Sequence, residues 1–357
     1  MRKNRLKDLR KEIDRIDSRV IELLNRRGKI SFDIGEIKKA KKQPIYSPDR
    51  ESLIYRKISK KNKGPFTDES VTAIYREIMS ACLSLEHSLV VAYLGPELTF
   101  THQVSIKKFG ASVTYLSCDN ISDVFREVEK GNADYGVVPI ENSIEGAVSH
   151  TMDMFANSPL MICSEACLRI RHSLLSKNDD ARSIARVYSN PQVFAQCRGW
   201  LEKNLYWAKL KESTSTAKAA EIAGKHPTSA CIASDLAAKR YDLKVVARSI
   251  EDSADNVTRF LVIGENMSSP SGDDKTSIMF SVKDRSGVLH DMLTPFKKAG
   301  INLTKIESRP SKLKAWKYYF FVDMEGHCMD GKVERALKKV QDKCDFIKIL
   351  GSYPRAK

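Results

Sequence analysis

The first 40 or so residues carry the clearest hydrophobic pattern of the chain. Apolar residues recur at alternating spacings of three and four, namely Leu6, Leu9, Ile13, Ile16, Val20 and Leu23, and after a slip Ile30, Ile34 and Ile37 continue the stripe. This spacing predicts one amphipathic helix that runs to about Lys41. A helix of about 35 residues is roughly 50 Å long, which is more than a small monomeric domain can cover. We therefore expect a partner helix from a second protomer.

The same helix carries three cations whose directions can be worked out. Arg27 and Lys38 are eleven residues apart and project from nearly the same side, whereas Arg10 lies seventeen residues before Arg27 and points about 100° away. One straight helix cannot aim all three at one small ligand, but a dimer can if Arg10 crosses into the neighbour's site. By spacing alone, a solvated basic face is the alternative interpretation.

Two further helices are predicted before residue 89. Ser47 can cap the first, with Pro48 at its first helical position. The second runs from about Asp68 to His87 and has apolar residues along one side. No strand pattern interrupts these helices, so residues 1–88 are predicted to form an all-α domain that pairs as an intertwined dimer.

From Leu89 the pattern changes to short apolar runs that alternate with helical stretches through Gly264. This alternation is typical of an α/β domain with a mainly parallel sheet. We predict such a domain over residues 89–265. Breaks near 157–164 and 246–255 indicate two lobes with a cleft between them.

Polar residues cluster where strands of this domain begin or end. Three such clusters occur: the first ends an apolar run, the second follows a short predicted strand, and the third begins a predicted strand. The clusters are Glu141-Asn-Ser143, Ser189-Asn-Pro-Gln192 with Gln196, and Asn256-Val-Thr-Arg-Phe260. Strand ends deliver polar side chains to the edge at which α/β sheets bind ligands. A plain strand end with a polar turn is the alternative from pattern alone.

The last 90 or so residues predict a third domain. Residues 266–275 have the composition of a linker. Beyond them we expect a strand at 276–282, a helix at 287–299, strands at 301–309 and 317–325, a helix at 330–343 and a final strand. Residues 276–357 are therefore predicted to form an α+β domain of βαββαβ order, and the 357-residue chain to have several domains.

Composition and charge narrow the function. The formal net charge is +15, but the basic residues spread over the whole chain and no aromatic-basic RNA-binding signature occurs, so no nucleic acid is expected. Small polyanionic substrates fit the charge, because a basic surface raises their encounter rate. No apolar run approaches the roughly 18 residues of a membrane span, and the N-terminus lacks the apolar core of a signal peptide. We expect a cytoplasmic protein that does not bind membranes.

Eight cysteines are scattered over the chain and are expected to be reduced thiols. Cys163 and Cys167 with the nearby His172 lack a second pair of ligands. No metal is therefore expected, because free cysteine mostly behaves as a small buried apolar residue.

The three polar clusters resemble prephenate dehydratase, whose signatures are a Glu-Asn-Ser turn, a Ser-His-Pro-Gln turn and a Thr-Arg-Phe triplet. The resemblance implies that prephenate loses carbon dioxide and its ring hydroxyl to give phenylpyruvate. It implies that Thr258 protonates or hydrogen-bonds the departing hydroxyl and that Arg259 binds a carboxylate of the substrate. The other cleft residues that it implies are Glu141, Asn142, Ser143, Ser189, Gln196, Glu212, Ser213 and Phe260. Because threonine is a poor acid, Glu141 or Glu212 is an alternative proton source.

Two positions depart from the dehydratase pattern. Leu98 stands where a Gly is usual in Gly-Pro-x-Gly-Thr, and Asn190 stands where a His is usual. A left-handed backbone at Leu98 would cost roughly 1–2 kcal/mol, unless the turn is rebuilt.

The N-terminal domain resembles the all-helical chorismate mutases through Leu9-Arg10, Arg26-Arg27, Gly35-x-x-Lys38, Arg50-Glu51 and Ile74-Tyr-Arg-Glu-Ile-Met79. That family's substrate positions fall on Arg10, Arg27, Lys38, Ser47, Arg50, Glu51, Cys82 and Glu86. Ser47, Cys82 and Glu86 depart from the common Asp, Ser and Gln. Chorismate is a dianion that rearranges in one intramolecular step, so the resemblance implies no cofactor and no nucleophile. Arginine forks suit its carboxylates, and Lys38 and a protonated Glu86 would flank the ether oxygen.

The C-terminal domain resembles a regulatory ACT domain of ferredoxin-like order. The resemblance implies that phenylalanine binds at two motifs, Gly287-Val288-Leu289 at a helix N-terminus and Glu307-Ser308-Arg309-Pro310. Val288 stands where many phenylalanine-sensing members have Ala. A plain α+β domain used for dimer contacts is the alternative.

All three resemblances occur in the order of the bifunctional chorismate mutase/prephenate dehydratases. They imply an enzyme of phenylalanine biosynthesis that acts on chorismate and prephenate, is inhibited by phenylalanine and forms a homodimer or higher homo-oligomer. An arogenate-preferring dehydratase and a non-catalytic amino-acid sensor are the alternatives.

Overall fold

The computed structural model describes residues 2–311 and 318–356, with side chains from Arg5 onward. The chain divides into two compact units. One contains Met1–Val90 and Lys108–Thr114, and the other contains Val91–Lys107 and Tyr115–Lys357. Each is described by itself below.

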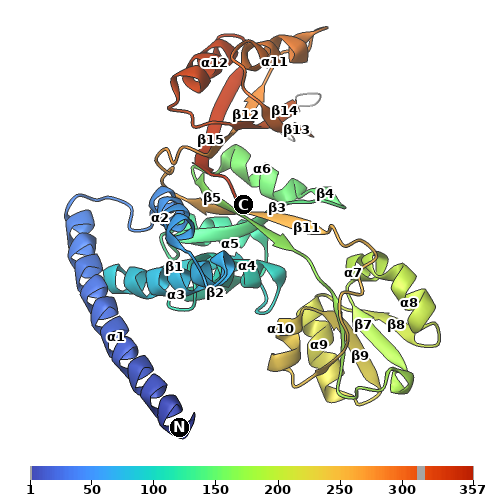
Figure 1. The fold of residues 1–357 in the computed structure, drawn as a ribbon. Helices are drawn as coiled ribbons and strands as arrows, with labels where there is room; N and C mark the ends of the chain where they lie inside the picture. The colour runs from blue at the N-terminus through green and yellow to red at the C-terminus, as the bar shows by residue number, and fades with distance from the viewer. Residues whose placement is uncertain (1, 312–317, 357) are drawn as a thin grey trace. The chain divides into compact units, whose positions relative to one another are not determined.

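Three helices make up most of the first unit. They are α1 (Arg2–Ala40), α2 (Pro48–Lys61) and α3 (Asp68–Glu86) (Figure 1). Thr67 caps α3 by accepting a hydrogen bond from Ser70 N at 3.2 Å. Ser47 occupies the N-cap position of α2, but its side chain makes no capping bond. The segment Lys108–Thr114 joins the helices, because Ala111 N donates to Glu77 Oε2 at 2.9 Å.

The apolar stripe predicted on α1 is exposed within a single chain. Leu6, Leu9, Ile13 and Ile16 are each 50–56% exposed. The C-terminal part of the same helix packs against α3, where Gly28 and Gly35 face Leu85 and Glu86. The N-terminal half of α1 is thus an amphipathic helix whose apolar side is exposed in the part of the chain that the structure describes.

A six-stranded sheet forms the first lobe of the second unit, in the order β2-β1-β3-β11-β5 with β4 beside β3. The strands are β1 (Val90–Leu94), β2 (Thr114–Cys118), β3 (Tyr135–Asn142), β4 (Gly146–Ala147), β5 (Met161–Arg169) and β11 (Val257–Gly264). Its helices are α4 (Phe100–Phe109), α5 (Ile121–Glu129) and α6 (Ser149–Asn157). On α5, Ile121, Val124, Phe125 and Val128 are buried, which is the spacing of one helix face.

The expectation of a mainly parallel sheet was wrong. Strand β1 is parallel to β3, but β11 is antiparallel to both β3 and β5. The reason is the path of the chain, which leaves the first lobe after β5 and returns to it through β11. A strand that leaves and a strand that returns run in opposite directions, so β5 and β11 pair as antiparallel neighbours.

The second lobe contains a five-stranded mixed sheet, in the order β10-β6-β9-β7-β8. Its strands are β6 (Ser173–Ser176), β7 (Arg186–Ser189), β8 (Lys209–Glu212), β9 (Ser229–Ala233) and β10 (Lys244–Ala247). Its helices are the short 3₁₀ turn η1 (Ala181–Ser183), α7 (Pro191–Gln196), α8 (Arg198–Asn204), α9 (Thr216–Lys225) and α10 (Asp235–Arg240). The first break was expected near 157–164, but the chain crosses between the lobes after Arg169, because β5 pairs with β11 over its whole length.

Four antiparallel strands form the C-terminal domain, in the order β13-β14-β12-β15. The elements follow one another as β12 (Asp274–Ser281), α11 (Val288–Lys298), β13 (Leu303–Pro310), β14 (Tyr318–Glu325), α12 (Gly331–Gln341) and β15 (Phe346–Pro354). Met292 and Phe296 of α11 and Val333 of α12 share one core cluster with Ile278 and Val322 of the sheet. Both helices therefore cover the same face (Figure 1).

Three remaining expectations concern single segments. The stretch 266–275 is packed, since Ser268 and Ser271 are buried and Ser268 Oγ donates to Cys163 O at 2.6 Å. Lys317, the expected start of a strand, lies outside the described residues, and β14 begins at Tyr318. Among the described helices, none has the length and apolar character that a membrane span requires.

Candidate active sites

A cavity of about 290 Å³ lies in the helical unit, between α1, α2, α3 and the residues Lys108 and Phe109. Its walls contain every member of the predicted mutase set except Arg10, namely Arg27, Lys38, Ser47, Arg50, Glu51, Cys82 and Glu86. Arg10 is an exposed residue of α1 and lies outside the cavity. The structure thus brings together residues that lie up to 59 positions apart in the sequence.

Close packing of two helices sets the position of Glu86. A Cβ at Gly35 would lie 2.9 Å from Glu86 Cβ, so a larger residue would push α3 away from α1. Glu86 is 8% exposed, and its Oε2 lies 3.3 Å from Lys38 Nζ. The ammonium of Lys38 also donates to Ile45 O at 2.6 Å, which aims it at the cavity from a fixed position. Elsewhere in the lining, Arg27 Nη1 donates to Cys82 Sγ at 2.6 Å.

Glu51 is held on both oxygens. Its Oε2 accepts from Tyr46 Oη at 2.8 Å and from Lys108 Nζ at 2.9 Å, and its Oε1 accepts from Tyr55 Oη at 3.1 Å. Burial and the neighbouring Glu51 carboxylate raise the pKa of the Tyr55 phenol. Glu51 therefore keeps part of the wall rigid and offsets some of its positive charge.

The charge of this cavity favours an anion. Its lining contains five cationic side chains, Arg27, Lys38, Arg50, Arg76 and Lys108, against the two carboxylates Glu51 and Glu86. Arg76 and Lys108 were not predicted. Lys108 could not be found by motif, because it belongs to a later part of the chain that folds back onto the helices.

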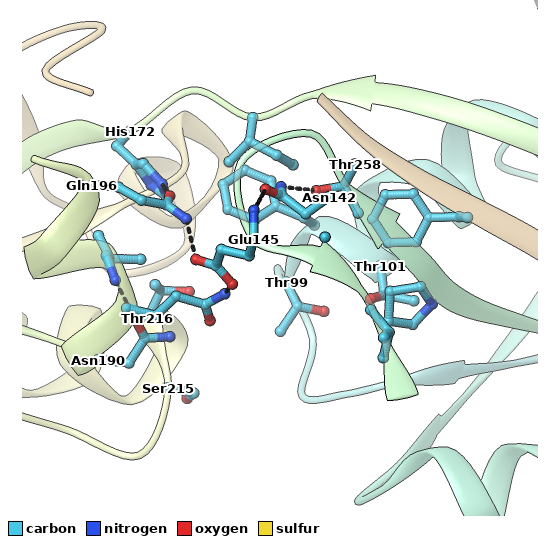
Figure 2. A pocket seen from close by; sticks show the side chains of 18 of the residues that line it. Thr99, Thr101, Asn142, Glu145, His172, Asn190, Gln196, Ser215, Thr216 and Thr258 are labelled. Carbon is cyan, nitrogen blue, oxygen red and sulfur yellow. Dashed lines mark hydrogen bonds between the residues drawn. The ribbon is translucent and has the colours of Figure 1, made fainter. Parts of the chain in front are cut away.

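A second cavity, of about 500 Å³, lies between the two lobes of the central domain. The first lobe contributes residues 99–101, Asn142, the turn 145–148, Thr258 and Phe260, and the second contributes Asn190, Gln192, Val193 and residues 214–216. Gln196 and His172 complete the wall beside them. Figure 2 shows the polar side chains from both lobes around the same space.

Four of the predicted dehydratase residues line this cavity, namely Asn142, Gln196, Thr258 and Phe260. Thr258 is the sheet partner of Asn142, and Arg259 is the partner of Glu141. Because successive side chains of a strand face opposite sides, the first pair reaches the cavity while the second pair faces away. Arg259 and Glu141 are thus not placed as direct contacts of a ligand in this cavity.

The guanidinium of Arg259 lies in a buried cluster instead. Its Nε donates to Glu165 Oε2 at 2.7 Å, its Nη1 to Asp323 Oδ2 at 2.5 Å and its Nη2 to Tyr353 Oη at 2.9 Å. Asp323 and Tyr353 belong to β14 and β15. Glu141 Oε2 pairs with Lys305 Nζ of β13 at 2.9 Å. Both residues therefore connect the central domain to the C-terminal domain.

The other four predicted residues also lie outside the cavity lining. Ser143 Oγ donates to Asp255 O at 2.8 Å and accepts from Val257 N at 3.0 Å, which clips its turn to the start of β11. Ser189 Oγ donates to Ile232 O at 2.9 Å within the second sheet. Glu212 is exposed on the edge strand β8, and Ser213 Oγ donates to Ser215 O at 2.9 Å.

Several residues that line this cavity were not predicted from the sequence. Glu145 is the one carboxyl in the described lining, and His172 is its one imidazole. Glu145 Oε1 accepts from Gln196 Nε2 at 2.6 Å, and Gln192 of the second lobe also binds this carboxylate. Glu145 lies three residues after Asn142 in the same turn, a spacing that could have drawn attention to it. No comparable local signal pointed to His172.

Comparison with known proteins matches three family models to consecutive parts of the chain. The chorismate mutase type II model matches residues 9–87, the prephenate dehydratase model 91–268 and the ACT domain model 276–342. The bifunctional chorismate mutase/prephenate dehydratase of Aquifex aeolicus is 53% identical over 355 residues, which are 98% of each chain. Its counterpart from Neisseria gonorrhoeae is 44% identical and covers 97% of this chain and 96% of its own.

The chain belongs to the bifunctional chorismate mutase/prephenate dehydratase family. Among solved structures, the prephenate dehydratase of Arthrobacter aurescens in complex with L-Phe is 33% identical. It has a TM-score of 0.69 and covers 75% of this chain and 90% of its own.

In the dehydratase domain, Leu98 keeps the left-handed backbone that its position calls for. Its φ is 70°, so the turn has not been rebuilt around the larger residue, and the conformation costs roughly 1–2 kcal/mol. Leu98 N donates to His102 Nδ1 at 3.0 Å, and burial lowers the pKa of His102. Both effects keep this imidazole neutral, and the turn places Thr99 in the cavity wall.

Asn190, the other departure, begins a helix. It is the N-cap of α7, where its Oδ1 accepts from Val193 N at 2.8 Å, and Pro191 follows at the first helical position. Asn190 also lines the cavity, so it contributes a polar side chain to the wall while it caps the helix.

In the ACT domain, neither of the two predicted effector motifs is part of the lining of either cavity. Gly287 has a φ of 77° and precedes α11, which begins with Val288 and Leu289. Glu307, Ser308, Arg309 and Pro310 end the edge strand β13. Arg309 Nη1 donates to Ser149 Oγ at 2.6 Å, and its Nη2 lies 3.3 Å from Asp153 Oδ1, so this arginine contacts α6 of the dehydratase domain.

Proposed function

We propose that this protein converts chorismate to prephenate in its helical domain and prephenate to phenylpyruvate in its two-lobed domain, two steps of phenylalanine biosynthesis. The observation that carries the proposal is the presence of two separate cavities, each lined by residues of one family's motifs. Neither reaction requires a cofactor, because the first is an intramolecular rearrangement and aromatisation of the ring drives the second.

The cation-rich cavity suits the mutase step. Arg27 and Arg50 would bind the carboxylates of chorismate, holding the dianion in its reactive conformer. Lys38 and a protonated Glu86 would donate to the ether oxygen, where negative charge grows as the carbon–oxygen bond breaks. The Lys38 ammonium is already aimed at that region by Ile45 O.

Thr258 would serve the dehydratase step. The bond to the ring carboxyl breaks and releases carbon dioxide, its electron pair enters the ring, and the hydroxyl leaves as water after gaining a proton. Thr258 Oγ1 accepts from Asn142 Nδ2 at 2.8 Å, so its own hydrogen remains available for the departing hydroxyl. Glu141 and Glu212 lie outside the cavity and are not placed to supply the proton, whereas Glu145 lies in its wall.

We further infer a homodimer that completes the mutase site. The stripe of half-exposed apolar residues on the N-terminal half of α1 would pair with a second copy of the chain. In that arrangement Arg10, which lies outside its own cavity, would reach the neighbour's substrate.

Phenylalanine is proposed to inhibit the dehydratase through the ACT domain. The likeness to a dehydratase solved with L-Phe supports this. Two groups of contacts could transmit the signal, Arg309 to Ser149 and Asp153 at the start of α6, and Arg259 to Asp323 and Tyr353. Arg259 directly follows Thr258, and Ser149 directly follows the cavity residue Val148.

Thr258→Ala should abolish phenylpyruvate formation while prephenate still accumulates from chorismate. The two sites are separate, and loss of the hydroxyl donor should slow the dehydratase by about a hundredfold or more. A coupled assay with chorismate supplied and both products measured tests this, with the exposed Thr228→Ala as the matched control. Loss of both activities in a folded variant would contradict separate sites, and preferred turnover of arogenate by the wild type would correct the substrate.

Mixing Arg10→Ala chains with Lys38→Ala chains should restore mutase activity to about a quarter of the wild-type value. Half of the dimers in an equimolar mixture are heterodimers, and one of their two sites is intact. Mass spectrometry of the mixture shows whether heterodimers form, and the assay measures prephenate. As a control, Arg10→Ala mixed with the double variant should restore nothing. Heterodimers without activity would rule out a shared site.

Glu86→Gln should keep mutase activity near the wild-type value, whereas Glu86→Ala should lower it by about a hundredfold or more, because a Gln amide still donates a hydrogen bond to the ether oxygen and Ala offers no donor. Prephenate formation from chorismate measures this effect. Dehydratase activity of the same variants, assayed with prephenate, serves as the internal control and should stay at the wild-type value. Unchanged mutase activity in Glu86→Ala would show that Glu86 is not the ether-oxygen donor.

Arg309→Gln should weaken inhibition by phenylalanine without removing phenylalanine binding, since its guanidinium contacts α6. Phenylalanine at millimolar concentration should raise the melting temperature of both wild type and variant, whereas the half-inhibitory concentration should rise several-fold in the variant. Arg355→Gln, which removes an ion pair with Glu325 inside the ACT domain, is the control. If Arg309→Gln abolished the thermal shift, Arg309 would be a direct effector ligand instead.

A further inference from the structure

The orientation of the Asn142 side chain is set by the backbone. Its Oδ1 accepts from Ile144 N at 2.9 Å and from Glu145 N at 3.2 Å. A backbone N–H can only donate, so the atom that faces the turn must be the oxygen. The amide nitrogen of Asn142 therefore points in the other direction.

Both hydrogens of this nitrogen are used. Asn142 Nδ2 donates to Thr258 Oγ1 at 2.8 Å and to Asn256 Oδ1 at 2.8 Å. The first bond is drawn in Figure 2. Thr258 is thereby fixed as an acceptor toward Asn142 and a donor toward the cavity. The bond to Asn256 fixes the amide of that residue in turn.

Asn256 continues this series of fixed donors and acceptors to Gln196 of the second lobe. It is fully buried and does not line the cavity. With its Oδ1 occupied by Asn142, its Nδ2 donates to Gln196 Oε1 at 3.0 Å, and Gln196 Nε2 then donates to Glu145 Oε1 at 2.6 Å. Reversal of any one amide would bring two donors or two acceptors face to face.

His172 ends this series of hydrogen bonds. Its Nε2 lies 2.9 Å from Gln196 Oε1, which can only accept, so Nε2 must carry the hydrogen. Within the described part of the chain, Nδ1 is buried without a partner. Burial also lowers the pKa of His172, which favours the neutral ring.

We propose that Asn256 is a positioning residue of the dehydratase: it fixes one hydrogen of the Asn142 amide, whose other hydrogen goes to Thr258, and it passes the orientation set by the backbone at Ile144 and Glu145 on to Gln196 of the second lobe. The proposal rests on the proposed dehydratase function for its kinetic consequences, but its structural content is independent of activity. The side chain of Asn256 hydrogen-bonds to Asn142 and Gln196, and its backbone oxygen accepts from Ile170 N of the cavity wall at 2.8 Å.

Asn256→Asp is the sharpest kinetic test because it changes one donor into an acceptor at constant size. One oxygen still accepts from Asn142, but the other then faces Gln196 Oε1 without a hydrogen. Because burial raises the pKa of a carboxyl at this fully buried position, we expect kcat/KM for prephenate to fall about 10- to 100-fold near pH 8 and to recover toward the wild-type value at about pH 5.5, where the protonated carboxyl donates again.

The surrounding titratable groups are the same in both proteins. They are Glu145 on the turn after β3, His172 before β6, and Glu251, Asp252 and Asp255 on the segment that returns to β11. The wild-type profile measured in parallel therefore removes their contribution. Asn204→Asp, on the exposed surface of the second lobe, adds the same charge and should leave both rate and profile unchanged. Circular dichroism and the melting temperature report whether each variant is folded.

A loss of activity in Asn256→Asp that is equal at all pH values would overturn the proposal, as would unchanged activity. A second test uses the wild-type protein, so it does not depend on whether a variant with a new buried charge folds. Nitrogen-15 NMR of the wild-type protein should show His172 as the neutral Nε2–H tautomer, its signals assigned among the seven histidines by their loss in His172→Gln. An Nδ1–H tautomer would overturn the proposed order, whereas absence of prephenate turnover would refute only the proposed function.

Discussion

The antiparallel pairing of β11 with β3 is the constraint on which the central domain depends. It sets Thr258 opposite Asn142 and Arg259 opposite Glu141. One pair faces the cavity between the lobes, and the other faces the ACT domain. A shift of one residue would exchange the two pairs, because side chains alternate along a strand. The same register therefore builds the proposed catalytic site and the contact to the regulatory domain.

The contact between the central domain and the ACT domain contains a cluster of buried ion pairs around Arg259. Arg259 is balanced by Glu165 and Asp323, and Lys275 Nζ also pairs with Glu165 Oε2 at 2.9 Å. Removing one member of such a cluster would leave an uncompensated charge, which typically costs several kcal/mol. The ACT domain is thus joined to the residue next to Thr258 by bonds that cannot be lost singly without a large effect.

The helical domain depends on a different balance. Its cavity contains more cations than carboxylates, and acceptors of the protein itself hold several of the cations, among them Arg27, Lys38 and Lys108. These bonds fix the positive groups in place before a ligand arrives, which is the arrangement that electrostatic stabilisation of a developing charge requires. The apolar side of α1 remains exposed in one chain, and it is the face on which the proposed homodimer would form.

Local periodicity and motif chemistry were enough to predict the three helices of the first domain, the order of strands and helices in the last, and several of the side chains that line the two cavities. These features depend on neighbours within a few positions, which the sequence displays directly. The sequence could not decide which of two adjacent strand residues faces the cavity, and so it grouped Arg259 and Glu141 with Thr258 and Asn142. It also missed Lys108, Glu145 and His172, and it expected a mainly parallel sheet. Each of these depends on the pairing of segments far apart in the chain, such as β11 with β3, and only the tertiary structure decides that pairing.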